Sequence, residues 1–315
     1  MGVSPAIVKR LPLRQMAITI KGNNFYKDGR RIRLAGNHTW NNVQRIAGQQ
    51  IGIDKITGNF TRAWTIETGG AIFSQSQWGS NTPGLVKVQD GPWKKDGSLN
   101  NRFYTNLENF AKKAEKRDIV VGVSLFENSI ERLFPRAWEN HPFNGLGPPT
   151  YDKVHTKGPW NKFQREHVKG VVNTLEQYDN IFYEVGNELP SASVKWFQPK
   201  VVKWVKKWSD KPVGVSYASG IRASRGRDEL AWMKRAGADW YGPTFTALQR
   251  GQFNRAGKPI VFDTDHSWPL LSNPAGLKDV WSKGHNVWVM DGFNGTMLRN
   301  QNSLGPDLNL INGWV

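Results

Sequence analysis

The chain alternates between short apolar runs and segments with helical periodicity. Runs rich in β-branched, aromatic and aliphatic residues are typical of strands, whereas apolar residues at i, i+4 and i+7 are typical of helices. The strand-like runs cover residues 31–40, 59–65, 119–126, 181–185, 212–217, 238–241, 258–262 and 286–290. Helical patterns cover residues 103–114, 163–175, 194–208 and 228–236. Such alternation requires crossovers that return the chain, so it predicts a parallel sheet.

Eight strand units in about 280 residues favour a closed (β/α)8 TIM barrel over a doubly wound open sheet. No Gly-rich phosphate loop supports the open sheet, because Gly69-Gly70 and Gly145-Leu146-Gly147 lack the strand-turn-helix setting. We expect one barrel over residues 17–315, preceded by a basic N-terminal arm, residues 1–16. A small β-hairpin, with Asp28-Gly29 as its turn, leads into the first strand. Residues 68–100 and 130–160 are predicted to be long loops.

Polar side chains gather where several strands end. The clearest case is Ile181–Pro190, an apolar run that ends in Asn187-Glu188. In a (β/α)8 barrel, the carboxyl ends of the strands carry the functional site. The other candidates at strand ends are Asn37, His38 and Trp40 on strand one, Arg62 and Trp64 on strand two, Glu127 on strand three, and Asp263, Asp265 and His266 on strand seven.

The charge of the chain indicates a partner with negative charge, or simply a solvated basic surface. Lys and Arg total 43 against 26 Asp and Glu, giving a formal net charge of +17. Nucleic acid, an acidic glycan and an anionic surface would all fit. The absence of Cys excludes disulfides and thiolate metal sites. No signal peptide or apolar membrane span is visible, so the chain could act in the cytoplasm, in a virion, or outside the cell after removal of a signal.

Several of these features together resemble the clan A glycoside hydrolases, near the cellulase-like family 5. The resemblance covers residues 17–295 and rests on the hairpin over 18–34, the Asn187-Glu188 pair, the run Lys258–Phe262, and Trp288 at the end of strand eight. It implies a barrel in which Glu188 is the general acid/base. Asn187 would bind a substrate hydroxyl near the reacting carbon. By the same resemblance, Tyr241 would contact the nucleophile and Arg62 would neutralise its charge.

Strand seven departs from this pattern. Thr264 stands where the clan normally has its nucleophilic Glu, flanked by Asp263 and Asp265. In a regular strand both Asp side chains would face opposite to Thr264. A bulge near the strand end would restore the aim of Asp265, and bulges are common beside active sites. We therefore expect Asp265, or else Asp263, to act as nucleophile or charge stabiliser, unless the second carboxylate has been lost.

Other candidates have both a functional and a structural interpretation. Trp64 and Trp288 could stack on sugar rings or pack in the core. His38, Trp40, Glu127 and His266 could bind substrate, whereas the Asp-Thr-Asp-His segment could instead cap a loop. His141 and His155 share a loop with Glu139 and Asp152, but their spacing fits no compact metal motif. No metal or other cofactor is expected.

The sequence predicts a retaining glycoside hydrolase that cleaves a polysaccharide, an acidic one in preference to a neutral one. The alternative is a non-catalytic carbohydrate-binding or assembly protein on the same barrel, for example a virus-particle component with partner subunits. A nucleic-acid partner is disfavoured because it rests on charge alone. The Lys-rich helix over 194–208 has Trp204 and Trp208 on one face, which packing against the barrel explains more simply.

Overall fold

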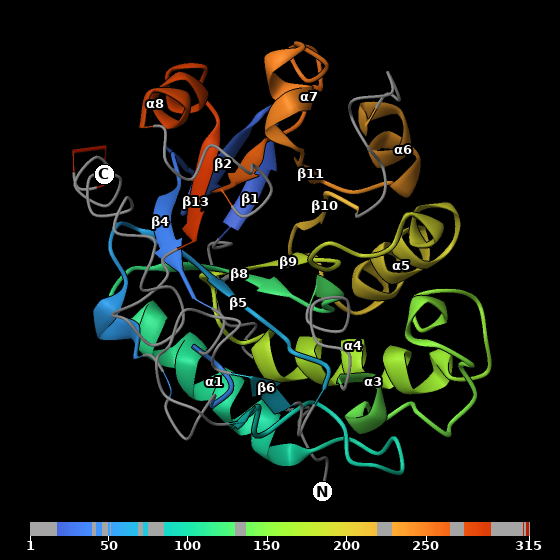
Figure 1. The fold of residues 1–315 in the computed structure, drawn as a ribbon. Coiled ribbons are helices and arrows are strands. Elements are labelled where there is room, and N and C mark those ends of the chain that lie inside the picture. The colour runs from blue at the N-terminus through green and yellow to red at the C-terminus, as the bar shows by residue number, and fades with distance from the viewer. Residues whose placement is uncertain are drawn as a thin grey trace, which may run out of the picture.

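The computed structural model describes residues 18–39, 42–45, 50, 52–68, 72–74, 85–129, 137–218, 229–264, 274–290, 311 and 313–314. Within these residues, eight strands form the wall of a barrel and helices surround it (Figure 1). The wall strands are β4 (Ala35–His38), β5 (Phe60–Ala63), β8 (Val120–Ser124), β9 (Ile181–Glu184), β10 (Val213–Ser216), β11 (Trp240–Gly242), β12 (Val261–Asp263) and β13 (Asn286–Met290).

Backbone hydrogen bonds close the ring of strands. Parallel ladders join β5, β8, β9, β10 and β11 in that order, and a second parallel set joins β12, β13 and β4. Between β11 and β12, the N–H of Tyr241 donates to the carbonyl of Pro259 (3.0 Å). Between β4 and β5, the N–H of Asn59 donates to the carbonyl of Ala35 (3.1 Å). The predicted (β/α)8 barrel is therefore confirmed, with strand positions close to those expected.

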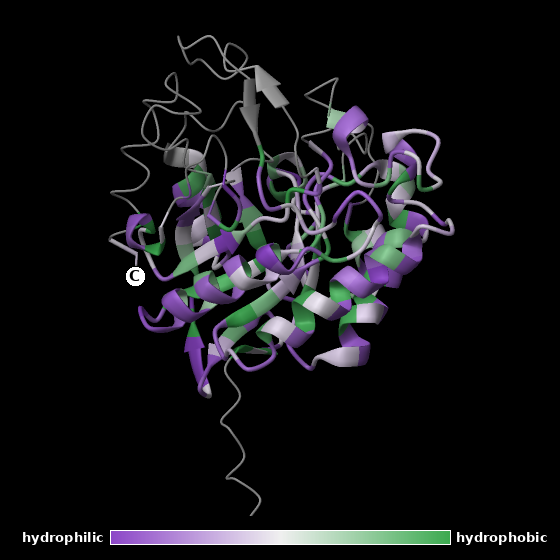
Figure 2. Cartoon of the chain, turned by 90° about the horizontal axis from the view of Figure 1, so that it is seen from below, coloured by the Kyte–Doolittle hydropathy of each residue, from purple (hydrophilic) through white to green (hydrophobic). Residues whose placement is uncertain are grey.

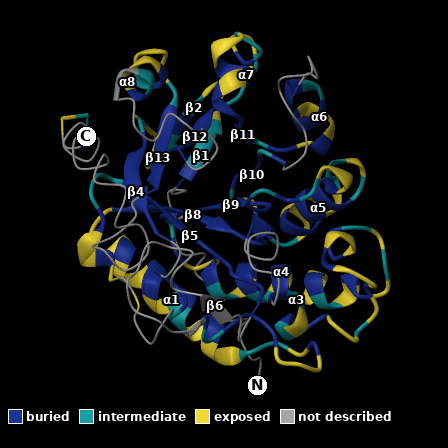
Figure 3. Ribbon diagram, in the orientation of Figure 1, coloured by how far each residue is buried: buried dark blue, intermediate teal, exposed yellow. Residues whose placement is uncertain are grey.

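The helices lie outside the wall and turn their apolar faces toward it, as the inward-facing buried residues in Figure 3 and the hydropathy in Figure 2 show. In α1, the residues at the predicted spacing, Phe103 to Ala114, are the buried ones. The helices are α1 (Asn101–Glu115), α3 (Ala137–Asn140), α4 (Asn161–Leu175), α5 (Phe197–Trp208), α6 (Glu229–Ala236), α7 (Phe245–Gln249) and α8 (Pro274–Ser282), with 3-10 turns η1 (Ile53–Lys55), η3 (Tyr151–Lys153) and η4 (Ser191–Lys195).

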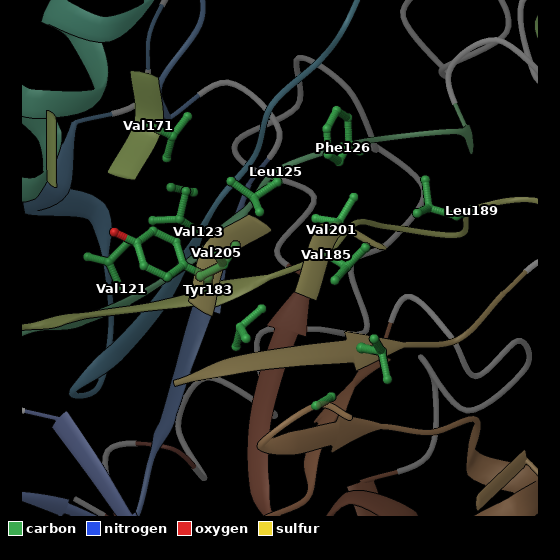
Figure 4. Close-up of a cluster of buried hydrophobic side chains, with 14 of the residues drawn as sticks. Val121, Val123, Leu125, Phe126, Val171, Tyr183, Val185, Leu189, Val201 and Val205 are labelled. Carbon is green, nitrogen blue, oxygen red and sulfur yellow. The ribbon is translucent and has the colours of Figure 1, made fainter. Parts of the chain in front are cut away.

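The main core lies between the wall and the helices. Outward-facing strand residues such as Val121, Val123 and Tyr183 pack toward Val171 of α4 and Val205 of α5 (Figure 4). Period-two alternation sends every second strand residue into this layer and its neighbours into the barrel interior. Burial of these apolar side chains is the main term that stabilises the fold.

A second, aromatic core fills the barrel interior on the side of the N-terminal ends of the strands. It contains Ile18, Phe25, Leu34, Phe60, Val120, Phe182, Trp240, Val261 and Trp288. Glycines on two strands make room for the two indoles. A Cβ at Gly122 would lie 2.3 Å from the Trp288 ring, and one at Gly214 would lie 2.0 Å from the Trp240 ring. Side chains therefore fill this half of the barrel interior, which leaves the carboxyl ends of the strands as the place for polar residues.

An antiparallel sheet closes the N-terminal end of the barrel. Its strands are β1 (Ile18–Lys21), β2 (Asn24–Lys27) and β3 (Arg30–Ile32). The predicted Asp28-Gly29 turn is present, with φ of 51° and 76°, and joins β2 to β3. The structure adds the middle strand β2, because buried Phe25 stacks on Phe182 of the barrel at 5.2 Å between ring centroids.

The predicted loops contain short elements. In the first, β6 (Ile72–Ser74) pairs with β7 (Leu85–Lys87). The second carries α3 and η3. The predicted arm, residues 1–16, lies outside the described residues. No helix within the described part of the chain has the length and apolar character needed to cross a bilayer.

Candidate functional site

A buried arginine organises the upper barrel interior. Arg62 of β5 is fully buried, and its Nε donates to Oε2 of Glu184 on β9 (2.7 Å). Its Nη1 donates to Oδ2 of Asp263 on β12 (2.9 Å) and to Oδ1 of Asn187 (3.1 Å). One guanidinium thus holds three groups, from the ends of β9 and β12, through charge-assisted hydrogen bonds. We call Arg62, Glu184, Asn187, Asp263 and His38 the Arg62 cluster.

His38 and two indoles surround this cluster. The Nε2 atom of His38, on β4, lies 3.2 Å from Oδ1 of Asp263. The His38 ring stacks on Trp64 at 5.8 Å between centroids. The Arg62 guanidinium lies 4.6 Å from the Trp64 ring centroid and 5.3 Å from that of Trp288. Both indoles are only 1 % exposed, so in this structure they pack in the core and do not offer a face to a sugar.

Strand β12 directs Asp263 into the barrel. Its neighbour Phe262 packs outward, and the hydroxyl of Thr264 accepts a hydrogen bond from the N–H of Met290 (2.9 Å). Of the two carboxylates predicted on this strand, Asp263 thus receives the Arg62 guanidinium. Asp265, with His266 and Trp40, lies outside the described residues.

Glu188 stands just beyond the regular part of β9. The ladder with β8 continues to Asn187, whose N–H donates to the Phe126 carbonyl (2.9 Å). Glu188 follows with φ of +46°, in the left-handed region that costs a non-glycine residue free energy and is concentrated at functional sites. Asn187 is fully buried, whereas Glu188 is half-buried. The acid of the predicted Asn-Glu pair is therefore its more accessible member.

Strict alternation fails at this strand end. Regular alternation would place Glu184, Gly186 and Glu188 on one face, yet Glu184 and Asn187 both contact Arg62. Gly186 does not leave that face open, since a Cβ there would lie 2.8 Å from the carbonyl oxygen of Phe126. The strand bends after Glu184, which brings Asn187 into the interior.

Glu127 positions the amide of Asn187. Its Oε2 accepts from Nδ2 of Asn187 (2.9 Å), and its Oε1 accepts from the N–H of Ser129. Asn187 is thereby oriented, with its oxygen toward Arg62 and its nitrogen toward Glu127. Glu127 is 2 % exposed, and its carboxylate supports the Asn187 amide.

A further buried carboxylate, that of Glu67, lies next to this network. Oε1 of Glu67 accepts from the N–H of Glu127 (3.0 Å) and lies 2.7 Å from Nε2 of His155. Its Oε2 lies 3.6 Å from Nε2 of His141. Burial raises the pKa of Glu67, but His155 and His141 outweigh burial and hold it at about 2. We call Glu67, His141 and His155 the Glu67 cluster.

The two histidines of this cluster face the Glu67 carboxylate. Nδ1 of His141 accepts from the N–H of Phe143 (3.0 Å), which leaves the proton on Nε2, toward Glu67. Burial lowers the pKa of His141. Within the described residues, no three His, Asp or Glu side chains are arranged to hold a metal ion. Glu67 was not predicted as a site residue; its one signal in the sequence is a carboxylate three residues after Trp64.

Tyr241 is a correction to the sequence analysis. The alternation of β11 turns Trp240 into the barrel and Tyr241 outward, where its ring lies 6.3 Å from that of Phe253. The Nζ of Lys258 lies 5.7 Å from the Tyr241 centroid, and burial raises the pKa of the tyrosine. Tyr241 therefore belongs to the outer core and not to the Arg62 cluster. Asn37 likewise faces outward, to the backbone of Lys55 and Thr57.

Comparison with known proteins gives a fold and no sequence family. No family model matches the chain, and no curated protein sequence matches it. Solved structures do match. A β-mannanase from the blue mussel Mytilus edulis is 14 % identical, with a TM-score of 0.52 over 92 % of this chain and 96 % of that one.

Two further matches have the same character. A family 5 mannosidase from Rhizomucor miehei is 12 % identical, with a TM-score of 0.56 over 88 % of this chain and 85 % of that one. Endo-glycoceramidase II from Rhodococcus sp. is 11 % identical, with a TM-score of 0.59 over 93 % of this chain and 81 % of that one. The chain thus has the barrel fold of these glycoside hydrolases, which confirms the predicted resemblance at the level of fold.

Proposed function

We propose that this protein is a glycoside hydrolase with Glu188 as its general acid/base. The observation that carries the proposal is the half-buried Glu188, at the tip of β9, next in sequence to an asparagine that shares Arg62 with the carboxylate of Asp263. Glycoside hydrolysis needs one protonated carboxylic acid and one ionised carboxylate. A fold whose solved examples include mannanases and a glycoceramidase supports this assignment.

In this mechanism Glu188 protonates the leaving oxygen of the glycosidic bond. The ionised partner is Asp263 or Asp265. Asp263 is favoured among the described residues, because hydrogen bonds from Arg62 and His38 stabilise its charged form. The separation of the two carboxyl groups sets the outcome. About 5–5.5 Å gives retention through a covalent intermediate, and about 6.5–9.5 Å gives inversion through water. We propose retention.

The substrate we propose is a polysaccharide or glycoconjugate with negative charge. A net charge of +17 raises the local concentration of anionic substrates. The mannanase and glycoceramidase neighbours make β-mannan and a glycosphingolipid the neutral substrates to compare with acidic ones.

The first experiment replaces the acid. Glu188→Gln should fold normally, and its kcat on an unactivated oligosaccharide should fall about 10²–10⁴-fold. On an aryl glycoside, whose leaving group needs no proton, the rate of glycosidic bond cleavage by this variant should fall much less. The matched control is Glu139→Gln, an exposed carboxylate on α3, which should keep wild-type activity. Equal activity of Glu188→Gln and wild type on the oligosaccharide would remove Glu188 from the mechanism.

The second experiment identifies the ionised partner. Asp263→Asn and Asp265→Asn are compared on the aryl glycoside, where acid catalysis is not required. The variant that lacks the partner loses activity on both substrate types. The anomer of the first product, followed by NMR, then separates retention from inversion.

A non-catalytic carbohydrate-binding protein is the second candidate. It is favoured by one specific observation: Thr264 occupies the expected nucleophile position, while Asp263 is 2 % exposed and paired with Arg62. This candidate expects saturable glycan binding without product release, and binding that Glu188→Gln leaves unchanged. Any hydrolysis that depends on Glu188 excludes it.

A further inference from the structure

A cavity of about 410 Å³ lies at the end of the barrel opposite to Glu188. It is bounded by the turn between β1 and β2, by β3, by the segment that leads into β12, and by the turn between α8 and β13. We call it the basal pocket. The lining residues used below are Asn23, Asn24, Arg31, Lys258, Lys283 and His285.

The lining of the basal pocket carries positive charge without a carboxylate. Arg31, Lys258 and Lys283 are cationic, and none of the described lining residues is Asp or Glu. One carboxylate lies nearby, since Nζ of Lys283 pairs with Asp279 of α8 at 2.7 Å. The concentration of cations on one concave surface creates a positive potential that attracts anions.

Two of the basic side chains lack protein partners. Within the part of the chain that the structure describes, neither the Arg31 guanidinium nor the His285 imidazole forms a hydrogen bond or ion pair. Lys258 is half-buried; its amine donates to the Ala238 carbonyl and forms no ion pair with a described carboxylate. Burial, with Lys206 nearby, lowers the pKa of Lys258, while Asp239 opposes them. A bound anion would offset the positive charge that Arg31, Lys258 and Lys283 bring together on this surface.

We propose that the basal pocket binds an oxyanion, such as a sulfate, phosphate or carboxylate group, carried on a sugar. Arg31 presents a planar fork of donors suited to such a group, and Lys258 supplies a second cation. The volume argues for more than a free ion. A cavity of about 410 Å³ is much larger than a single oxyanion needs and lies within the range for small organic ligands.

The amides of the pocket support the sugar. Asn24 donates to Oδ1 of Asn23 at 2.8 Å, which leaves the Asn23 amide nitrogen available for hydroxyl groups. The sugar part rests on the proposed function, whereas the oxyanion part does not. For a polyanionic glycan, the basal pocket would anchor the chain at a distance from the site of cleavage.

His285 links anion binding in the pocket to proton uptake. Burial, then Lys283 and Arg33, lower the pKa of His285 to about 4, and Asp279 opposes them. Arg31 also faces the pocket. Near pH 5.5 the free imidazole is therefore neutral. An anion placed beside it favours the imidazolium form, so binding at this pH should take up protons.

The test is a calorimetric titration of the full chain in about 150 mM salt, which is close to physiological ionic strength. The probes are inorganic sulfate, inorganic phosphate, a sulfated disaccharide, its unsulfated counterpart and single-stranded DNA. Arg31→Gln combined with His285→Gln should weaken the sulfated disaccharide about tenfold or more. The control, Lys203→Gln with Lys207→Gln, removes two exposed cations from α5 and should change binding less than about twofold. Binding of the sulfated probe at pH 5.5 should take up protons, and His285→Gln alone should abolish the uptake.

The outcomes separate the possible sources of binding. Equal weakening in both double variants would show diffuse surface charge and overturn the site, as would the absence of saturable binding. Lys283→Gln serves as a second pocket variant if the first one folds poorly. If inorganic sulfate bound as tightly as the sulfated disaccharide, the proposal that the ligand includes a sugar would be overturned. If single-stranded DNA bound more tightly, and the pocket variants weakened that binding, the ligand would be a nucleic acid and not a glycan. Because binding is read directly, the proposal stands or falls independently of hydrolysis by Glu188.

Discussion

The Arg62 and Glu67 clusters bury carboxylates a short distance apart but compensate them differently. In the Arg62 cluster, a permanent cation sits between Glu184 and Asp263. In the Glu67 cluster, two histidines and a backbone N–H surround a single carboxylate. The arginine keeps its charge at every accessible pH, whereas the Glu67 carboxylate, with a pKa of about 2, can be protonated in strong acid. One cluster is thus a fixed electrostatic frame and the other is sensitive to acid.

Removing the permanent cation should have the largest effect. Arg62→Met leaves two buried carboxylates without their guanidinium, so the free energy of unfolding should fall by about 3–5 kcal/mol. Urea unfolding at pH 7 measures the loss. The matched control is Arg45→Met, which removes a partly exposed pair with Asp90 and should cost about 0–1 kcal/mol. Similar losses in the two variants would mean that the Arg62 cluster is not the fixed frame described above.

Replacing the acid-sensitive carboxylate should cost less, in a way that depends on pH. Glu67 has its pKa lowered from 4.5 to about 2, which corresponds to about 3 kcal/mol of stability. Since the folded pKa is depressed, this contribution is complete above pH 4.5 and disappears as the pH falls through about 2. Glu67→Gln should therefore be less stable than wild type at pH 7, and the two should converge near pH 2.

The control for this titration is Glu139→Gln, which removes an exposed carboxylate from the predicted loop 130–160 that also carries His141 and His155. Its unfolding free energy should run parallel to that of wild type from pH 7 to pH 2. Curves for Glu67→Gln that stay parallel to wild type would show that the histidines do not hold this carboxylate ionised.

The fold could be predicted because its signals are local. Most wall strands are apolar runs, and the helices α1, α4 and α5 show their own periodicity, so the alternation and the number of strand units favoured the barrel. The N-terminal sheet was only partly predicted, since β2 is short and just Phe25 is buried in it.

The sites depend on contacts that no local pattern encodes. Arg62 and Asp263 are 201 residues apart, and their contact follows from barrel closure and strand register. Asp263 was named second to Asp265 because the expected bulge was placed from the resemblance. Glu184 was not named as a site residue, since a carboxylate within an apolar strand gives no indication of its cation. Tyr241 was assigned by resemblance against the alternation that turns Trp240 inward.

The smallest expected effect concerns Asn187, which connects the two clusters. Its amide joins Arg62 to Glu127, and the N–H of Glu127 binds Glu67. Asn187→Leu has a similar volume but cannot make these hydrogen bonds, so the unfolding free energy should fall by about 1.5–3 kcal/mol.

A double-mutant cycle tests whether this connection transmits energy. If the amide acts mainly through the guanidinium, Asn187→Leu should cost less in the Arg62→Met background, with a coupling energy of about 0.5–3 kcal/mol. The same cycle with Glu67→Gln should give a smaller coupling, since the Glu67 carboxylate binds the backbone N–H of Glu127 and not its side chain. Additive losses in both cycles would mean that the clusters are separate buried charges that share a wall. A coupling energy with Glu67 larger than that with Arg62 would mean that Asn187 acts mainly through the Glu67 cluster.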